Sequence, residues 1–456
     1  MSTPESGLTA STRAGYGFGS VATGTFGTVP GPLLLPYLTD TLGIAAAVAG
    51  VIVFAPKAWD VILNPIAGRI SDRSTDPRGP RRPFLLKAGI ALALCFAVLF
   101  AAPDLGSKLL NGGWVLIAFL ACATAYAFFQ VPYVAMPAEM TESYDERTRL
   151  MTWRVAILAF AIMLSGATAP MIRNAAEGRD GYRYMGLFVA VLLIIGALGA
   201  YFGTAKAPIG KVKADTGSLA DQLRIISGAR DFRYLLITFV IQALATGSML
   251  AGVDYLARSV LGKPSASTIL FVCFVGPALL LTPLWASLGQ WIGKKSGFVL
   301  ASLVLATGAL LATGARAYPA WVVFLAVALV GVGYAGAQVF PMAMLPDCAA
   351  VDAAKTGQNR IGVYTGVWTA AETFGLALGP GVYAVVLAIG GYASSTSGTI
   401  TQSDSALNAI VIGFSVLPAI LVALSLVFLR KYSLTAEQVE AATGSTDSTA
   451  KEQSND

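Results

Sequence analysis

Apolar residues along the chain gather into long blocks that polar loops separate. Runs such as 88–102, 114–129, 187–201 and 321–332 are nearly free of charge. With its flanks, each run reaches the roughly 20 residues that an α-helix needs to cross a bilayer. Twelve such blocks can be counted, centred near residues 27, 55, 93, 124, 161, 193, 244, 278, 305, 331, 376 and 418. The pattern predicts an all-α membrane protein with twelve transmembrane helices, and it lacks the short alternating segments typical of a β-barrel.

Composition and charge sharpen this picture. Of the 456 residues, 55% are hydrophobic and 12% are charged, whereas soluble domains carry about a quarter charged residues. With both termini on one side, that side's loops and tails carry 23 Lys or Arg and the opposite loops carry seven. The positive-inside rule then predicts cytoplasmic termini in a multi-pass protein of the cell (inner) membrane. The net charge of +6 is a topology signal, so membrane lipids are expected as partners and nucleic acid is not.

The blocks divide into two halves of similar size around a long hydrophilic stretch. This six-plus-six plan is the hydropathy signature of the major facilitator fold, two six-helix bundles with cytoplasmic termini. Helical spacing of leucines within the linker predicts a short helix lying on the membrane face. The predicted parts are a disordered tail 1–12, a bundle 13–204, a cytoplasmic linker 205–232, a second bundle 233–431 and a mostly disordered cytoplasmic tail 432–456.

The residue types needed for an enzyme's active site or a metal centre are missing from the sequence. The chain has no His, and its four Cys lie in or near apolar blocks without metal-ligand spacing. No ATP-binding loop of the Gly-x-x-x-x-Gly-Lys-Ser/Thr kind is present. We therefore expect neither an enzyme nor an ATP-driven pump, and no cofactor or bound metal.

Ionisable side chains inside a span are costly and are functional candidates by default. The second block holds Lys57, Asp60 and Asn64, spaced three and four residues apart and hence on one helix face. Lys57 and Asp60 can pair one turn apart, and the alternative to a functional role is a static ion pair. Further candidates for coupling or substrate contact are Gln130, Arg154 and Glu372, and possible cavity-lining residues are Thr23, Tyr126, Tyr133, Tyr364 and Trp368.

Three other polar features admit simpler interpretations. Asp254 and Arg258, four residues apart, are expected to form a local pair. Gln242 can line a cavity or join two helices by a hydrogen bond. The loop after the second block carries Gly68, Asp72, Arg73, Arg81 and Arg82, which we interpret as a gate, and Gly289 to Lys295 form a degraded copy without the Asp.

Several strings in the chain resemble the glycoside–pentoside–hexuronide:cation symporters, the melibiose permease-like branch of the major facilitator superfamily. They are Tyr16-Gly-Phe-Gly19, Tyr37-Leu-Thr-Asp40, Trp59-Asp60, Asn64-Pro65, Val131-Pro132-Tyr133, Tyr144-Asp-Glu-Arg-Thr-Arg149 and Pro346-Asp347. The resemblance implies a cation site at Asp60, Asn64 and Gln130, where one carboxylate of the family's three survives. It implies that Thr23 and Arg154 lie in the sugar site, with Glu372 or Thr373 in place of a Lys.

Together these features predict a secondary transporter that moves a sugar-like or glycoside-like solute by alternating access. The poor sodium site favours proton-coupled or uncoupled transport over coupling to Na+, with Asp60 as the cation-sensitive group and Glu372 as a second candidate proton carrier. The alternative is a transporter of lysolipid or another amphipathic molecule, because the first block offers few polar side chains. A single chain is expected to be sufficient for transport, so the protein is expected to be a monomer.

Overall fold

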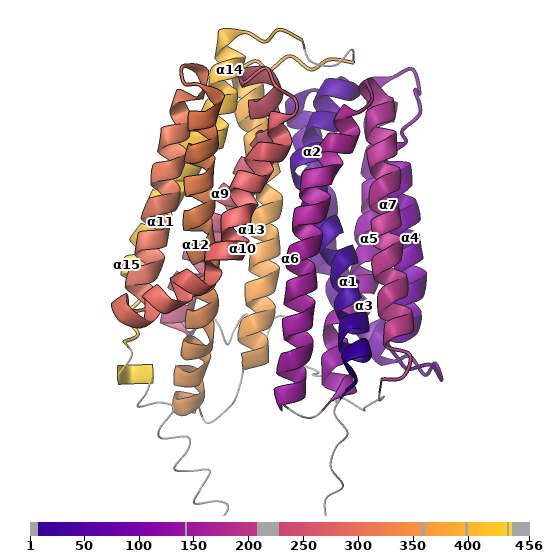
Figure 1. Ribbon diagram of the computed structural model, residues 1–456, viewed down its shortest axis with the longest axis vertical. Helices are drawn as coiled ribbons and strands as arrows, with labels where there is room; N and C mark the ends of the chain where they lie inside the picture. The colour runs from indigo at the N-terminus through magenta and orange to yellow at the C-terminus, as the bar shows by residue number, and fades with distance from the viewer. Residues whose placement is uncertain are drawn as a thin grey trace, which may run out of the picture. The chain divides into compact units, whose positions relative to one another are not determined.

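The computed structural model describes residues 8–141, 144–207, 228–356, 361–396, 400–435 and 437–439. Within these ranges the regular structure is entirely helical (Figure 1). The elements are α1 (Ala10–Thr28), α2 (Pro30–Pro36), η1 (Tyr37–Thr41), α3 (Ala46–Asp72), α4 (Arg82–Phe100), α5 (Lys108–Met140), α6 (Tyr144–Asn174), α7 (Gly178–Gly203), α9 (Arg230–Tyr255), η2 (Leu256–Val260), α10 (Ala266–Ile292), α11 (Lys294–Leu311), η3 (Ala312–Arg316), α12 (Ala320–Thr356), α13 (Ile361–Ile389), α14 (Asp404–Val411), η4 (Ile412–Val416) and α15 (Leu417–Arg430).

Eleven helices in the described part of the chain are long and apolar enough to cross a membrane. This confirms an all-helical membrane protein. The first predicted block is divided into α1, α2 and the π-helical turn η1, because Pro30 and Pro32 follow Thr28 closely and interrupt the helix. The predicted linker helix falls mostly on residues 208–227, outside the described ranges.

The chain forms two compact units. Unit 1 comprises Met1–Asp215, Leu250–Val272 and Pro380–Ile410, and unit 2 comprises Thr216–Met249, Cys273–Gly379 and Val411–Asp456. Unit 1 thus contains α1 to α7 together with one end of each of α9, α10 and α13. In unit 1 we call the end where α1 begins the proximal end and the opposite end the distal end. The predicted division into two six-helix bundles stays a prediction.

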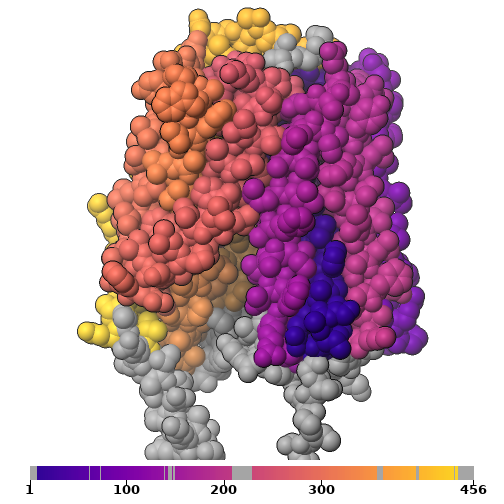
Figure 2. Space-filling model, viewed as in Figure 1, coloured from indigo at the N-terminus to yellow at the C-terminus, as the bar shows by residue number. Residues whose placement is uncertain are grey.

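Unit 1 is assembled around close helix contacts that only small residues permit. Helix α1 packs along both α6 and α7, as the ribbon and the space-filling view show (Figures 1 and 2). A side chain added at Gly15 would collide with the backbone of Gly203 in α7, and one at Gly17 would lie 3.3 Å from the Trp153 carbonyl oxygen in α6. Small residues at such crossings are typical of helix pairs in membranes, where van der Waals packing drives association.

Unit 2 is joined across its helices by a buried amide. Gln242 of α9 donates through Nε2 to Ser302 of α11 at 2.9 Å and to Ser425 of α15 at 3.0 Å. Its side chain is 4% exposed. Of the two interpretations of Gln242, the structure supports the helix-to-helix hydrogen bond.

Helices α5 and α12 each contain two internal prolines at the same spacing, which supports an internal repeat. Pro132 and Pro137 lie inside α5, and Pro341 and Pro346 lie inside α12. Each proline leaves the carbonyl four residues earlier without its helical donor. One freed carbonyl, that of Tyr133, accepts a hydrogen bond from the Tyr16 hydroxyl of α1 at 3.3 Å. The proline-containing part of α5 is therefore hydrogen-bonded to α1.

Candidate functional site

The centre of the candidate site is Asp60, which lies in α3 between two helix-interior prolines, Pro56 and Pro65. Its side chain is 4% exposed, and its Oδ1 has no hydrogen-bond partner. Among the described residues no ion pair joins it to Lys57, whose Nζ lies instead 5.3 Å from the centre of the Phe26 ring. The expected pairing is therefore not formed in this structure. A buried carboxylate without a partner is costly, so its environment is suited to binding a cation or a proton.

Two further polar groups extend the site within unit 1. The Tyr126 ring packs on Phe26 at 4.5 Å between centres and lies within electrostatic reach of both Asp60 and Arg154. Arg154 of α6 holds its guanidinium 5.7 Å from the centre of the Tyr133 ring, and its Nε has no partner. The structure thus brings Lys57, Asp60, Tyr126 and Arg154 together, two cations and one carboxylate beside the packed rings of Phe26 and Tyr126. Asn64 and Gln130, both partly buried, lie one turn further along α3 and α5.

Two predicted substrate residues, Tyr133 of α5 and Thr23 of α1, lie in or against the buried face of α1. The Tyr133 ring is fully buried and stacks on Tyr16 at 4.8 Å, and its hydroxyl contacts the Ser20 hydroxyl at 2.9 Å. Thr23 is 7% exposed and donates to the Ser20 carbonyl oxygen at 3.4 Å. In this structure Tyr133 joins α5 to α1, whereas the Thr23 hydroxyl bonds within α1, and contact of either side chain with a substrate stays a prediction.

The candidates on α13 belong to unit 2. Trp368 is 1% exposed and stacks on Phe239 at 4.3 Å, and the Tyr364 ring meets Phe232 at 4.6 Å. Tyr364 also borders a cavity of about 150 Å³ at the ends of α9 and α12. Glu372, one turn beyond Trp368, is partly buried and lies within electrostatic reach of Tyr334.

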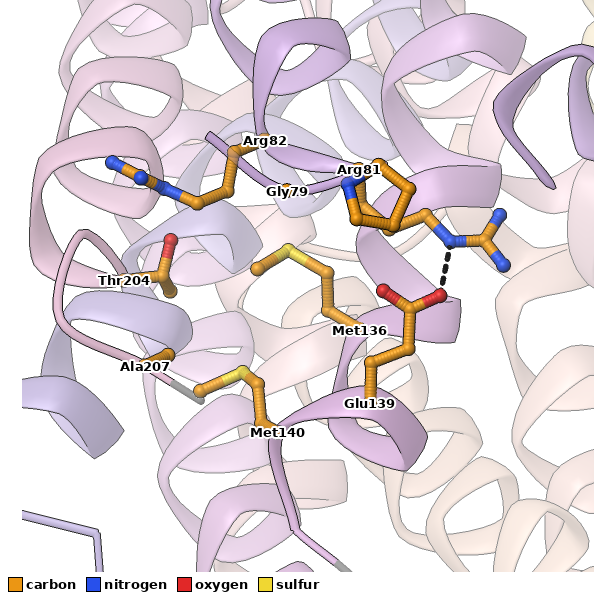
Figure 3. A pocket seen from close by; sticks show the side chains of 9 residues that line it. Gly79, Arg81, Arg82, Met136, Glu139, Met140, Thr204 and Ala207 are labelled. Atoms are coloured by element: carbon orange, nitrogen blue, oxygen red, sulfur yellow. Dashed lines mark hydrogen bonds and ion pairs between the residues drawn. The ribbon is translucent and has the colours of Figure 1, made fainter. Parts of the chain in front are cut away.

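The predicted gating loop fastens the proximal end of unit 1. Arg81 donates to Glu139 of α5 at 2.7 Å and to the Ser71 hydroxyl at 2.6 Å, and Arg82 donates to the Tyr201 carbonyl oxygen of α7 at 2.9 Å. Figure 3 shows Arg81 and Glu139 at one edge of a cavity of about 20 Å³, room for about one water molecule. A Cβ added at Gly68 would lie 3.6 Å from the side chain of Val131, which is ordinary van der Waals contact. Arg73 is exposed, and the side chain of Asp72 lies outside what the structure describes.

The degraded copy of this loop, Gly289 to Lys295, likewise binds neighbouring helices in unit 2. Lys294 pairs with Asp347 of α12 at 2.6 Å, and Lys295 donates to the Tyr432 carbonyl oxygen, beyond the end of α15, at 2.6 Å. In each unit the first basic residue binds an acid just past a helix proline, and the second binds carbonyls at the end of a later helix. Sequence reasoning missed Glu139 and Asp347 as partners, although both closely follow Pro137 and Pro346.

The exposed part of the gating loop contains a carboxylate, Asp76, that is hydrogen-bonded to Arg78. Asp76 accepts two hydrogen bonds from the Arg78 side chain, at 3.0 and 2.9 Å, and one from its backbone N–H at 2.9 Å. These bonds lower the pKa of Asp76 from 3.8 to about 2. The loop therefore keeps its local turn charged over the whole physiological pH range.

At the distal end of unit 1 lies a buried ion-pair network. Arg258 pairs with Asp254 at 3.2 Å, as predicted. Asp254 is also bound by both terminal nitrogens of Arg173 from α6, and the two side chains are 1% and 3% exposed. The Ser267 hydroxyl donates to Asp254 at 2.7 Å, and Arg173 donates to the Tyr182 hydroxyl at 2.9 Å. Sequence spacing missed Arg173 because its partner lies 81 residues away.

With this geometry established, similarity to known proteins decides the family. A family model described as "MFS/sugar transport protein" matches residues 15–436. The chain belongs to this family. It is 26% identical to the putative glycoside/cation symporter YagG of Escherichia coli over 95% of this chain and 94% of that protein. It is 25% identical to the E. coli glucuronide carrier protein homolog (93% and 92% covered) and 23% identical to the sodium-dependent lysophosphatidylcholine symporter 1-A of Danio rerio (95% and 87%).

Solved structures agree on the fold of this MFS/sugar transport protein. The D-xylose–proton symporter superposes with a TM-score of 0.65 at 15% identity over 94% of this chain and 97% of that one. The nucleoside transporter NupG superposes with a TM-score of 0.64 at 14% identity, covering 94% and 100%. The chain is a multi-pass membrane transporter of the symporter type and not an enzyme, and the predicted kinship with the glycoside–pentoside–hexuronide:cation symporters is confirmed.

Proposed function

We propose that this secondary transporter moves a glycoside or related sugar coupled to protons, with Asp60 as the coupling group. One observation carries the proposal: a carboxylate that is 4% exposed, has an unpartnered oxygen and lies between two helix prolines. Burial without an ion-pair partner disfavours charge, so proton binding removes a large energetic cost. Asn64 and Gln130 supply neutral oxygens only, which favours H+ over Na+ at this position.

Substrate recognition is assigned to the cationic side of the same cluster. Arg154 and Lys57 are suited to donate hydrogen bonds to sugar hydroxyls or a sugar carboxylate, and Tyr126 offers an aromatic face. The names of the relatives, a glycoside/cation symporter and a glucuronide carrier homolog, support a sugar-like solute. Glu372 is proposed as a further polar residue for coupling or substrate contact. The lysophosphatidylcholine symporter among the relatives keeps an amphipathic substrate as the alternative.

Transport by alternating access follows from the topology that we propose. Segment Ala10–Thr41 serves as the twelfth span, both termini lie in the cytoplasm of a cell whose inner membrane holds the protein, and one chain is sufficient. The distal end of unit 1 then faces the outside. The buried Arg173–Asp254 network seals that end and must open when solute enters from outside, so substrate and proton act by favouring one state over the other.

A thermal-shift panel on the purified protein tests the assignment. Sugars, glycosides, glucuronides and lysolipids are added with and without sodium, from pH 5 to pH 8. A ligand at 100 times its Kd stabilises the folded state by about 2.7 kcal/mol, well within detection. We expect stabilisation by a sugar-like solute that is lost in Arg154→Gln, unaffected by sodium and altered in pH dependence by Asp60→Asn. Asp104→Asn, an exposed loop carboxylate, is the matched control. Stabilisation by lysolipids alone overturns the sugar assignment, and sodium-dependent stabilisation overturns the proton.

A further inference from the structure

A second buried carboxylate, Asp40, lies at the distal end of unit 1 in the π-helical turn η1. Its side chain is 9% exposed. The hydroxyls of Tyr392 and Thr39 both donate to Oδ1, each at 2.8 Å. Among the described residues, neither an ion pair nor a hydrogen bond reaches Oδ2. The site is thus a buried acid whose two partners are hydroxyl groups and whose second oxygen is unoccupied by any donor.

Asp40 stands where three parts of the chain meet. The Thr39 hydroxyl also contacts the Tyr255 hydroxyl at the end of α9, at 2.7 Å, and the Ser395 backbone N–H donates to the Thr39 carbonyl oxygen at 2.9 Å. Tyr392 belongs to the segment that follows α13. These contacts join the end of the first span to α9 and to the loop after α13, so the distal end cannot open there without exposing Asp40.

The titratable and charged groups facing Asp40 come from every neighbouring element. They are Tyr182 of α7, Asp254 and Tyr255 of α9, Arg258 of η2, Tyr383 of α13 and Tyr392 of the segment after α13. Arg258, the one cation of this set, is engaged by Asp254 and Asn174. Asp254 is neutralised by two arginines, whereas Asp40 has hydroxyl partners alone. A proton on Oδ2 removes the uncompensated charge and leaves both hydrogen bonds to Oδ1 intact.

We propose that Asp40 is a second proton-binding group, which takes a proton from the outside solution when the distal end opens and holds it when that end closes. This inference rests on the proposed function for sidedness and for the opening itself. The proton passes from water to Oδ2, and no other bond changes. Closure buries a neutral acid more readily than a charged one. Proton binding outside therefore drives closure, which links the proton gradient to the conformational change at a place remote in sequence from Asp60.

Distances between spin labels at Leu109 and Ile389, two exposed residues of unit 1 at the start of α5 and the end of α13, report opening independently of transport. Labels are placed in a cysteine-free background, and spectra are recorded from pH 5 to pH 8. Because one proton is coupled, the closed-to-open ratio is expected to rise by up to about tenfold per unit fall in pH. Asp40→Asn, which imitates the neutral acid, is expected to stay closed throughout. Asp104→Asn, an exposed distal carboxylate, should keep the normal pH profile.

Tyr392→Phe is the second variant, because it removes one hydroxyl that favours the charged acid and leaves Asp40 titratable. Its closed-to-open ratio is expected to fall most at pH 8, where the acid is charged and depends on that hydroxyl, and to fall less at pH 5. An Asp40→Asn protein with the normal pH profile, or one open at every pH, overturns the proposal, as does a Tyr392→Phe protein whose closed-to-open ratio falls equally at pH 5 and pH 8. If neither pH nor added sugar changes the distances in the unaltered protein, alternating access itself fails and the inference falls with it.

Discussion

The ion pair between Arg173 and Asp254 gives the sharpest mutational prediction. Asp254→Asn removes the carboxylate that both Arg173 and Arg258 bind, and it leaves two guanidinium groups in a site where the side chains of Arg173 and Asp254 are 3% and 1% exposed. Removing one partner of a buried pair costs about 3–5 kcal/mol. If the pair exists only in the closed state, that cost raises the open fraction of the distal end by roughly a hundredfold or more, since about 1.4 kcal/mol is a factor of ten.

The assay measures the labelling rate of a single cysteine placed at Ala257. This residue is fully buried beside the pair, and a membrane-impermeant maleimide reaches it only when the distal end opens. We expect labelling in Asp254→Asn to be about a hundredfold faster. The exposed pair Arg183–Asp180, at 43% and 63% exposure, is the matched control, and Asp180→Asn should change the rate less than about fivefold.

A double variant separates opening from misfolding. Arg173→Met with Asp254→Leu replaces the two most buried charges of the network by apolar groups, and such replacements are often neutral or stabilising. Arg258, whose side chain is 20% exposed, keeps its hydrogen bond to Asn174. Its labelling rate should return toward that of the unaltered protein, and its thermal midpoint should stay within a few degrees. An unchanged rate in Asp254→Asn, with an intact fold, would refute the idea that this pair seals the distal end.

Three further predictions concern the proximal end of unit 1 and its helix contacts. Gly15→Val should lower the thermal midpoint strongly, because the added side chain would collide with the Gly203 backbone. Gly106→Ala is the control, since Gly106 has open space around it and the substitution tests only the strain of its positive φ. Equal midpoints in the two variants would contradict the packing argument. Glu139→Gln should cost about 1.5–3 kcal/mol in unfolding free energy, because it weakens a charged hydrogen bond to Arg81. A loss below about 0.5 kcal/mol would show that this pair does not fasten the loop. Asp76, with its pKa lowered to about 2, adds stability that is present above pH 3.8 and is lost as pH falls through about 2; a carboxyl NMR midpoint near 4 would contradict this.

Hydrophobic periodicity is sufficient to predict the class of the fold, because a membrane helix must be long and apolar along its whole length. Eleven of the expected helices appear with the lengths required to cross a bilayer in the described part of the chain. The first block did not form one uninterrupted helix, since Pro30 and Pro32 break it. Proline positions predict that break, whereas the hydropathy window alone does not.

Side-chain partners are less accessible to sequence reasoning. A pair four residues apart, Asp254 and Arg258, follows from helix geometry and is present. The partner of Asp254 on α6, Arg173, depends on how distant helices pack, and no spacing rule contains that information. The pairing expected for Lys57 and Asp60 was also not formed, because the Phe26 ring offers Lys57 another favourable contact. Spacing therefore identified the costly residues of the site and not the contacts that each one makes.

Substrate-induced proton flux shows directly whether Asp60 couples proton movement to solute movement. The purified protein is reconstituted in proteoliposomes, and currents are recorded when the sugar that stabilises it is added without a sodium gradient. We expect an inward current in the unaltered protein and in Asp104→Asn, and its loss in Asp60→Asn while the sugar still binds. A current of normal size and pH dependence in Asp60→Asn would show that Asp60 is not the coupling group.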